Sequence, residues 1–186
     1  EGAVPGGVFT RVARSHIRIG TFQWFATRQD HDNLRVLADY VIARHFPEAQ
    51  QAENAYLALL QGVIERQASL IAHWMQLGFI HGVMNTDNMS VLGLTLDYGP
   101  YGFMDSFDPD WICNHTDAGG RYTYEQQPHV GLWNLGRFVQ SILPLLSGDP
   151  DTAVEIGQKL LQRYRGVFDD AYMERMRAKL GLSQAR

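Results

Sequence analysis

The feature that most constrains the fold is an unbroken apolar stripe near the middle of the chain. Between Ala52 and Trp74, apolar residues recur at intervals of three and four, the period of an α-helix. Gly78, directly after Leu77, is typical of a helix C-cap. The sequence therefore predicts one long central helix with a buried face, formed by Ala52, Ala55, Tyr56, Leu59, Leu60, Val63, Ile64, Gln67, Leu70, Ile71 and Trp74.

Shorter stripes predict further helices on both sides, whereas residues 1–30 lack a clean period. Capping residues precede some of these stripes, and proline or glycine follows them. The expected helices run from 34 to about 46, from about 131 to 144, from 150 to about 164, and from 171 to 180.

Residues 79–100 are typical of turns and short strands rather than of helices. The run 90–96 predicts one or two short buried strands interrupted by Gly93. Residues 101–129 form a long segment rich in glycine, proline, aspartate and aromatic residues, and loops of this length are usually functional or disordered. The aromatic residues favour an ordered loop. The expected fold class is mainly α with a small β-hairpin.

Composition narrows the class of protein. A chain of 186 residues is long enough for one domain with a real core. The net charge of −4 argues against a nucleic-acid partner held by bulk phosphate attraction. No apolar run approaches the ~20 residues of a membrane span, so no membrane partner is expected. The chain starts at Glu1 without an initiator methionine, and we expect it to be a piece of a longer protein.

A polar turn after the central helix contains the residues with the clearest chemical potential. Asp87 and Asn88 lie in this turn, and the chain then returns to Asp97, next to Tyr98-Gly99. Kinases use a carboxylate to accept the proton of an attacking hydroxyl, and an amide and a second carboxylate to hold Mg²⁺ against phosphates. Mg²⁺ prefers such oxygen ligands. In ordinary kinases, however, the asparagine follows the catalytic aspartate by five residues rather than directly.

Each of these residues also has a purely structural interpretation. Asp87-Asn88 is compatible with a helix cap or an Asx-turn, and Asp97 with a turn at the end of a strand. Two arginines of the N-terminal segment, Arg11 and Arg18, are of a residue type that more often lies at the surface or in ion pairs.

Three other polar features have weaker functional interpretations. His31-Asp32 resembles the metal-binding pair of some phosphohydrolases, but it lies at an expected helix start. His81 is expected to be structural, bonding backbone near the polar turn. Cys113, the one cysteine, is either a buried inert thiol or a redox-sensitive residue of the long loop.

Longer strings of residues resemble the selenoprotein O family, also called YdiU. The resemblance extends from about residue 1 to about residue 146 and is found in His81 to Ser90, Leu92 to Pro100, Cys113-Asn114-His115-Thr116-Asp117, Gly120-Arg121-Tyr122, Gln126-Gln127-Pro128, Trp133-Asn134-Leu135, and upstream in Thr10 to Ala13 and Ser15 to Arg18. It implies a protein-kinase-like C-terminal lobe. It also implies an enzyme that moves AMP from ATP to Ser, Thr or Tyr hydroxyls of proteins.

The resemblance assigns a role to five residues. Asp87 is the implied proton acceptor, Asn88 and Asp97 are the implied ligands of Mg²⁺, with Mn²⁺ as an alternative, and Asp97 also serves nucleotide binding. Arg11 and Arg18 are the implied contacts to the ATP phosphates. The family is understood to bind ATP in a flipped pose, so that the α-phosphate faces the acceptor and pyrophosphate leaves.

The resemblance further implies that the chain lacks part of its active site. The family's other nucleotide contacts, including a lysine, lie on an upstream β-rich lobe, whereas the first lysine here is Lys159. We therefore interpret residues 1–186 as a partial kinase-like domain without its N-lobe, inactive when isolated. The resemblance implies a cytoplasmic location in bacteria and a mitochondrial one in eukaryotes, and a thiol or selenol partner for Cys113 near the C-terminus of the longer protein.

Two competing functions remain open from the sequence. The first is a pseudokinase module that binds nucleotide or scaffolds a partner without chemistry, which the presence of Asp87, Asn88 and Asp97 disfavours. The second is a true kinase that transfers the γ-phosphate, which the adjacent Asp87-Asn88 pair disfavours.

Overall fold

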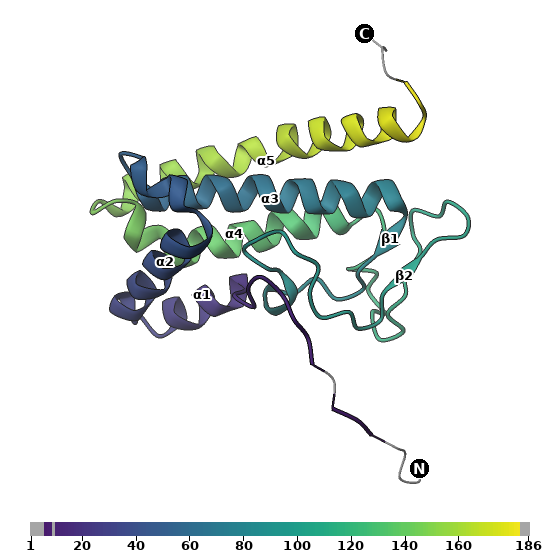
Figure 1. Ribbon diagram of the computed structural model, residues 1–186, viewed down its shortest axis with the longest axis horizontal. Helices are drawn as coiled ribbons and strands as arrows, with labels where there is room; N and C mark the ends of the chain where they lie inside the picture. Colours follow the sequence, from purple (N-terminus) through teal and green to yellow (C-terminus); the bar gives the residue numbers. More distant parts are fainter. Residues whose placement is uncertain (1–5, 9, 183–186) are drawn as a thin grey trace.

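A computed structural model describes residues 6–8 and 10–182 and shows a mainly helical chain (Figure 1). Among these residues, two strands form one small antiparallel sheet, as the expected fold class predicts. The elements in chain order are helices α1 (Ile19–Thr27) and α2 (His31–His45), a 3-10 helix η1 (Pro47–Gln51), helix α3 (Ala55–Leu77), strand β1 (Phe79–Ile80), a 3-10 helix η2 (Thr86–Asn88), strand β2 (Gly102–Phe103), and helices α4 (Gln127–Leu146) and α5 (Pro150–Lys179).

The predicted central helix is confirmed as α3. The Asn54 side chain caps its first turn by accepting from the amides of Tyr56 and Leu57, and Gly78 ends it with a left-handed φ of 69°. Figure 1 shows α3, α4 and α5 side by side along the long axis of the molecule, and α3 packs against both neighbours. Its buried face forms the centre of the core and comprises Leu59, Leu60, Val63, Ile64, Gln67, Ala68, Ile71, Ala72 and Trp74.

Helix α2 and the start of α5 also follow the sequence prediction. The Asp30 carboxylate accepts from the amide of Asn33, and the Asp149 carboxylate accepts from the amide of Thr152. Pro150 occupies the first turn of α5, where its missing N–H costs no hydrogen bond.

The prediction of two separate helices after residue 150 is wrong, because α5 runs unbroken to Lys179. The chain between them keeps aromatic contacts at the i, i+4 spacing of a helix. Tyr164 stacks with Phe168, and Phe168 stacks with Tyr172. These contacts continue the helix through a stretch whose sequence has little apolar periodicity.

One other helix prediction needs correction, and one helix was not predicted. Helix α4 begins at Gln127, four residues before the expected start, and continues two residues past Pro144. A proline so close to the C-terminus removes only one of the last helical hydrogen bonds. Helix α1 lies in the segment that lacks a clean apolar period. The period is absent because only Ile19 and Phe22 of its nine residues are buried.

The small sheet also differs in place from the prediction. Strand β1 pairs with β2, with Phe79 opposite Phe103 and Ile80 opposite Gly102. Residues 90–96 form no strand, and their pairing is limited to isolated bridges between Met89 and Thr95 and between Arg18 and Ser90. Among the described residues no helix is both long and apolar enough to cross a membrane.

Two glycines of α4 provide a matched test of core packing. A Cβ on Gly131 would collide with the side chain of Ile71 and lie 2.9 Å from the hydroxyl of Tyr164, whereas a Cβ on Gly136 would meet nothing within 4 Å. We expect Gly131→Ala to lower the free energy of unfolding by about 1 kcal/mol or more. Gly136→Ala should raise it by about 0.5–1 kcal/mol. Urea denaturation of the chain measures both, and equal effects would contradict this packing.

Candidate active site

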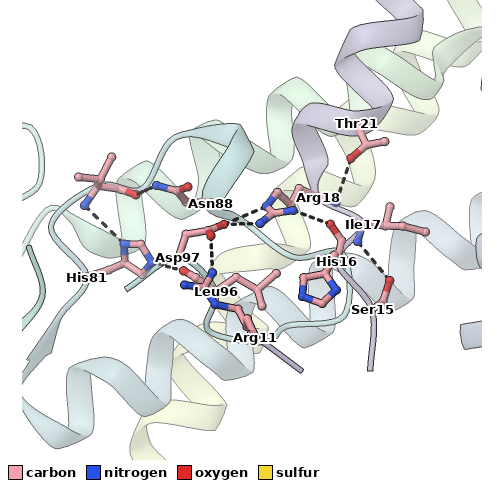
Figure 2. Close-up of polar contacts among 11 residues, drawn as sticks. Arg11, Ser15, His16, Ile17, Arg18, Thr21, His81, Asn88, Leu96 and Asp97 are labelled. Carbon is pink, nitrogen blue, oxygen red and sulfur yellow. Dashed lines mark hydrogen bonds and ion pairs between the residues drawn. The ribbon is translucent and has the colours of Figure 1, made fainter. Parts of the chain in front are cut away.

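The site is a cluster of polar side chains from two parts of the chain. One is the N-terminal segment with Arg11 and Arg18, and the other is the segment from His81 to Asp97 (Figure 2). The carboxylate of Asp97 accepts hydrogen bonds from Arg18 Nε at 2.9 Å and Arg18 Nη2 at 2.6 Å, and it forms an ion pair with Nη1 of Arg11. Arg18 also donates to the carbonyl of His16 at 2.8 Å. The structure therefore brings together three of the five predicted site residues through direct contacts.

The electrostatics of Asp97 follow from these contacts. Burial raises the pKa of the Asp97 carboxyl, but the hydrogen bonds and charges of Arg18 and Arg11 outweigh burial, so that the pKa lies below its ordinary value. Asp97 is thus a carboxylate at neutral pH. Its backbone adopts a left-handed φ of 57°, a conformation that aspartate and asparagine tolerate better than most residues.

Asn88 ends the short helix η2 and belongs to the hydrogen-bond network drawn in Figure 2, which links it to the residue before Asp97 through Val83 and His81. Its amide nitrogen donates to the carbonyl of Val83 at 2.8 Å. Because the nitrogen is held in this way, the orientation of the side-chain oxygen is also fixed. This oxygen is the atom that could bind a metal ion.

Asp87 is exposed and lies against the first turn of α1. A Cβ on Gly20 would collide with Oδ1 of Asp87, so the carboxylate occupies the space that this glycine leaves free. Next to it, the hydroxyl of Thr86 donates to Oε1 of Gln23 at 2.9 Å, which ties the turn to the same helix. Within the described part of the chain, Asp87 forms no ion pair.

His81 is fully buried and structural, as predicted. Its Nε2 lies 2.9 Å from the carbonyl of Leu96, and its Nδ1 accepts from the amide of Val83 at 3.4 Å. Burial lowers the pKa of His81 and keeps the ring neutral. The ring therefore links the polar turn to the residue before Asp97.

The remaining polar candidates gain little support. His31 and Asp32 are exposed in the first turn of α2. The described residues contain no group of three or more His, Cys, Asp and Glu side chains that could hold a metal ion. Cys113 is half-buried, its Sγ lies 3.7 Å from the carbonyl of Ile80, and burial raises the pKa of its thiol, all of which suits an unreactive thiol.

Sequence reasoning missed the amide side chains that support the site. Gln127, Asn134 and Asn114 donate to the carbonyls of Phe79, Met84 and Gly82, respectively. All three belong to strings that carry the family resemblance, but their spacing gives no sign of these contacts.

Comparison with known proteins identifies the family. The model of the family described as "Protein adenylyltransferase SelO" matches residues 2–186. The chain belongs to this family. Relatives named "Protein nucleotidyltransferase YdiU" include one from Rhodopseudomonas palustris strain HaA2, 56% identical over 179 residues, which are 96% of this chain and 36% of the relative. Another, from Methylorubrum populi, is 54% identical over 186 residues, which are 100% of this chain and 37% of the relative.

Family membership confirms the resemblance that the motifs predict. Transfer of a nucleotidyl group is the activity for which the family and these relatives are named. The chain spans little more than a third of the length of the curated relatives that it matches.

The Asp97 ion pairs predict a pH-dependent contribution to stability. The folded pKa lies below the ordinary value of 3.8, so the stabilisation is present above that value and is lost as the pH falls through the folded pKa. We expect Asp97→Asn, which tolerates the same left-handed backbone, to lower the free energy of unfolding by about 1 kcal/mol at pH 7. The difference from wild type should disappear in strong acid.

Thermal unfolding of the chain from pH 7 down to pH 2.5 measures this difference. Asp105→Asn is the matched control, because Asp105 is exposed and has no ion pair among the described residues. A wild type no more stable than Asp97→Asn at neutral pH would contradict the prediction.

Proposed function

We propose that residues 1–186 are the C-lobe half of a kinase-like domain, and that the full-length protein moves AMP from ATP to Ser, Thr or Tyr hydroxyls of proteins. The main support is the direct pairing of Asp97 with Arg11 and Arg18, with Asn88 linked to the same site through Val83 and His81. A lobe of this kind needs an upstream partner lobe, so the isolated chain is proposed to be inactive. Since the relatives above are bacterial, we propose a cytoplasmic location.

The donor set fits Mg²⁺ and equally Mn²⁺. Asn88 and Asp97 offer an amide oxygen and a carboxylate, both hard ligands, and Mg²⁺ in nucleotide sites takes few protein ligands and keeps waters and phosphate oxygens. Both side chains are only partly buried, which leaves access for a nucleotide. When bound, the ion would neutralise charge on the phosphates and on the leaving pyrophosphate.

The remaining residues have roles that follow from their positions. The substrate hydroxyl oxygen attacks the α-phosphorus, the bond from that phosphorus to pyrophosphate breaks, and Asp87 accepts the hydroxyl proton. Asp87 suits this role because it is exposed and has no ion pair among the described residues. Arg11 and Arg18 bind phosphate oxygens through guanidinium groups. The choice of the α-phosphate rests on the family relationship.

The pairing of Arg11 and Arg18 with Asp97 leads us to propose an order of events. While Arg11 and Arg18 neutralise the charge of Asp97, this carboxylate attracts a metal ion only weakly. The phosphates of ATP offer the arginines a more highly charged partner. Their transfer from Asp97 to ATP would free the carboxylate for the ion that arrives with the nucleotide.

Labelled ATP distinguishes AMP transfer from its alternatives in the full-length protein. We expect label from the α position of ATP to remain on protein, and label from the γ position not to. Asp87→Asn should reduce the rate by roughly 10²- to 10⁴-fold, the usual contribution of a general base. Label retained from the γ position would instead indicate a kinase. Label from neither would indicate a pseudokinase that only binds nucleotide. Labelled UTP tests whether UMP is also transferred.

The arginine–aspartate pairs also predict linked binding of metal and nucleotide. We expect Arg18→Gln to weaken ATP binding about tenfold, through loss of a charge-assisted hydrogen bond. The same change should strengthen Mg²⁺ binding without nucleotide, because Asp97 loses a cationic partner. Calorimetry on the full-length protein measures both, with Arg14→Gln as the control at an exposed arginine. Weaker binding of both ligands in Arg18→Gln would contradict the exchange.

A further inference from the structure

Gln127 is a fully buried side chain at the start of α4 that contacts the backbone just before the polar turn. Its Oε1 accepts from the amide of His81 at 3.0 Å, and its Nε2 donates to the carbonyl of Phe79 at 2.9 Å. The amide thus bonds the chain on both sides of Ile80, as a neighbouring strand would. One side chain therefore fixes where the segment after β1 leaves the sheet.

The segment that Gln127 holds leads directly to both proposed metal ligands. His81 contacts the carbonyl of Leu96, the residue before Asp97. His81 also accepts from the amide of Val83, whose carbonyl in turn holds the side chain of Asn88. Figure 2 shows both branches starting from the His81 ring. A shift of His81 would therefore move Asn88 and Asp97 relative to each other.

We propose that Gln127 is a positioning residue that sets the placement of Asn88 relative to Asp97. This placement in turn sets the affinity of the site for Mg²⁺ in the presence of ATP. This inference rests on the proposed function, because it takes these two residues as the metal ligands. Outer partners of metal ligands commonly change metal affinity by 10- to 100-fold when they are removed. The hydrogen bonds of Gln127 in the described part of the chain reach neither ligand directly, and its link to both runs through His81.

A purely structural role makes a different prediction. If Gln127 only satisfied two buried backbone groups, its loss would lower the free energy of unfolding and leave Mg²⁺ affinity unchanged in the protein that remains folded. The half-saturating Mg²⁺ concentration for ATP binding is therefore the decisive measurement. It is independent of whether AMP transfer occurs.

The test uses calorimetric ATP binding to the full-length protein over a range of Mg²⁺ concentrations, well below the unfolding temperature. Gln127→Met keeps an unbranched side chain of similar length and removes the hydrogen bonds to His81 and Phe79, together with the weaker one from Nε2 to Sδ of Met75. We expect it to raise the half-saturating Mg²⁺ concentration by roughly 10- to 100-fold. Gln126→Met is the matched control, because Gln126 is the adjacent residue and its side chain makes no capping hydrogen bond. This variant should bind Mg²⁺ as the wild type does.

Gln127→Glu tests whether restored hydrogen bonds rescue the Mg²⁺ affinity. It also tests the positioning role if Gln127→Met does not fold. A protonated glutamic acid can accept from the amide of His81 and donate to the carbonyl of Phe79, whereas a carboxylate cannot donate. We expect Mg²⁺ affinity, relative to wild type at the same pH, to be low at pH 8 and to recover towards pH 5.5. An unchanged half-saturating Mg²⁺ concentration in a folded Gln127 variant at pH 8 would overturn the positioning role. Loss of Mg²⁺-dependent ATP binding from the wild type itself would instead overturn the proposed function and this inference together.

Discussion

The structure depends on one constraint, which is that the buried backbone between β1 and Ser90 must find hydrogen-bond partners without an extended sheet. Buried amides and carbonyls left unpaired cost about 1–3 kcal/mol each, and the sheet supplies partners for only two residues of this stretch. Amide side chains supply many of the others. Gln127 holds Phe79 and His81, and the carbonyls beyond them are held by Asn114, Asn88, Asn134 and Gln67.

This use of amides explains how a mostly irregular segment can hold chemical groups in fixed positions. An amide offers a donor and an acceptor on one short, neutral side chain, so it can replace a strand without adding charge to the core. The helices that provide Gln67, Gln127 and Asn134 belong to the packed bundle, which makes the anchors rigid. Among the described residues, Oε1 of Gln67 and Oδ1 of Asn134 are buried and accept no hydrogen bond, whereas the donor group of each holds a backbone carbonyl.

The sequence predicts well those elements whose signal is local. The α3 stripe, the Asp30 and Asp149 caps and the turn at Gly78 each depend on residues close together in the chain. Arg11, Arg18 and Asp97 were predicted to serve one site only through the family resemblance, and the structure joins them across about 80 residues or more. Helix α1, the β1–β2 pairing and the contacts of Gln127 leave no such local signal, because tertiary packing alone decides them.

The charge arrangement at Asp97 shows why the site needs this support. Two guanidinium groups converge on one partly exposed carboxylate, and this carboxylate follows a residue whose carbonyl is held by buried His81. Removal of the cations by a nucleotide would leave Asp97 charged in a left-handed backbone conformation. In the exchange proposed above, the His81–Leu96 hydrogen bond would keep the carboxylate in place while its partners change. The neutral, buried part of the site thus preserves the geometry that the charged, exposed part uses.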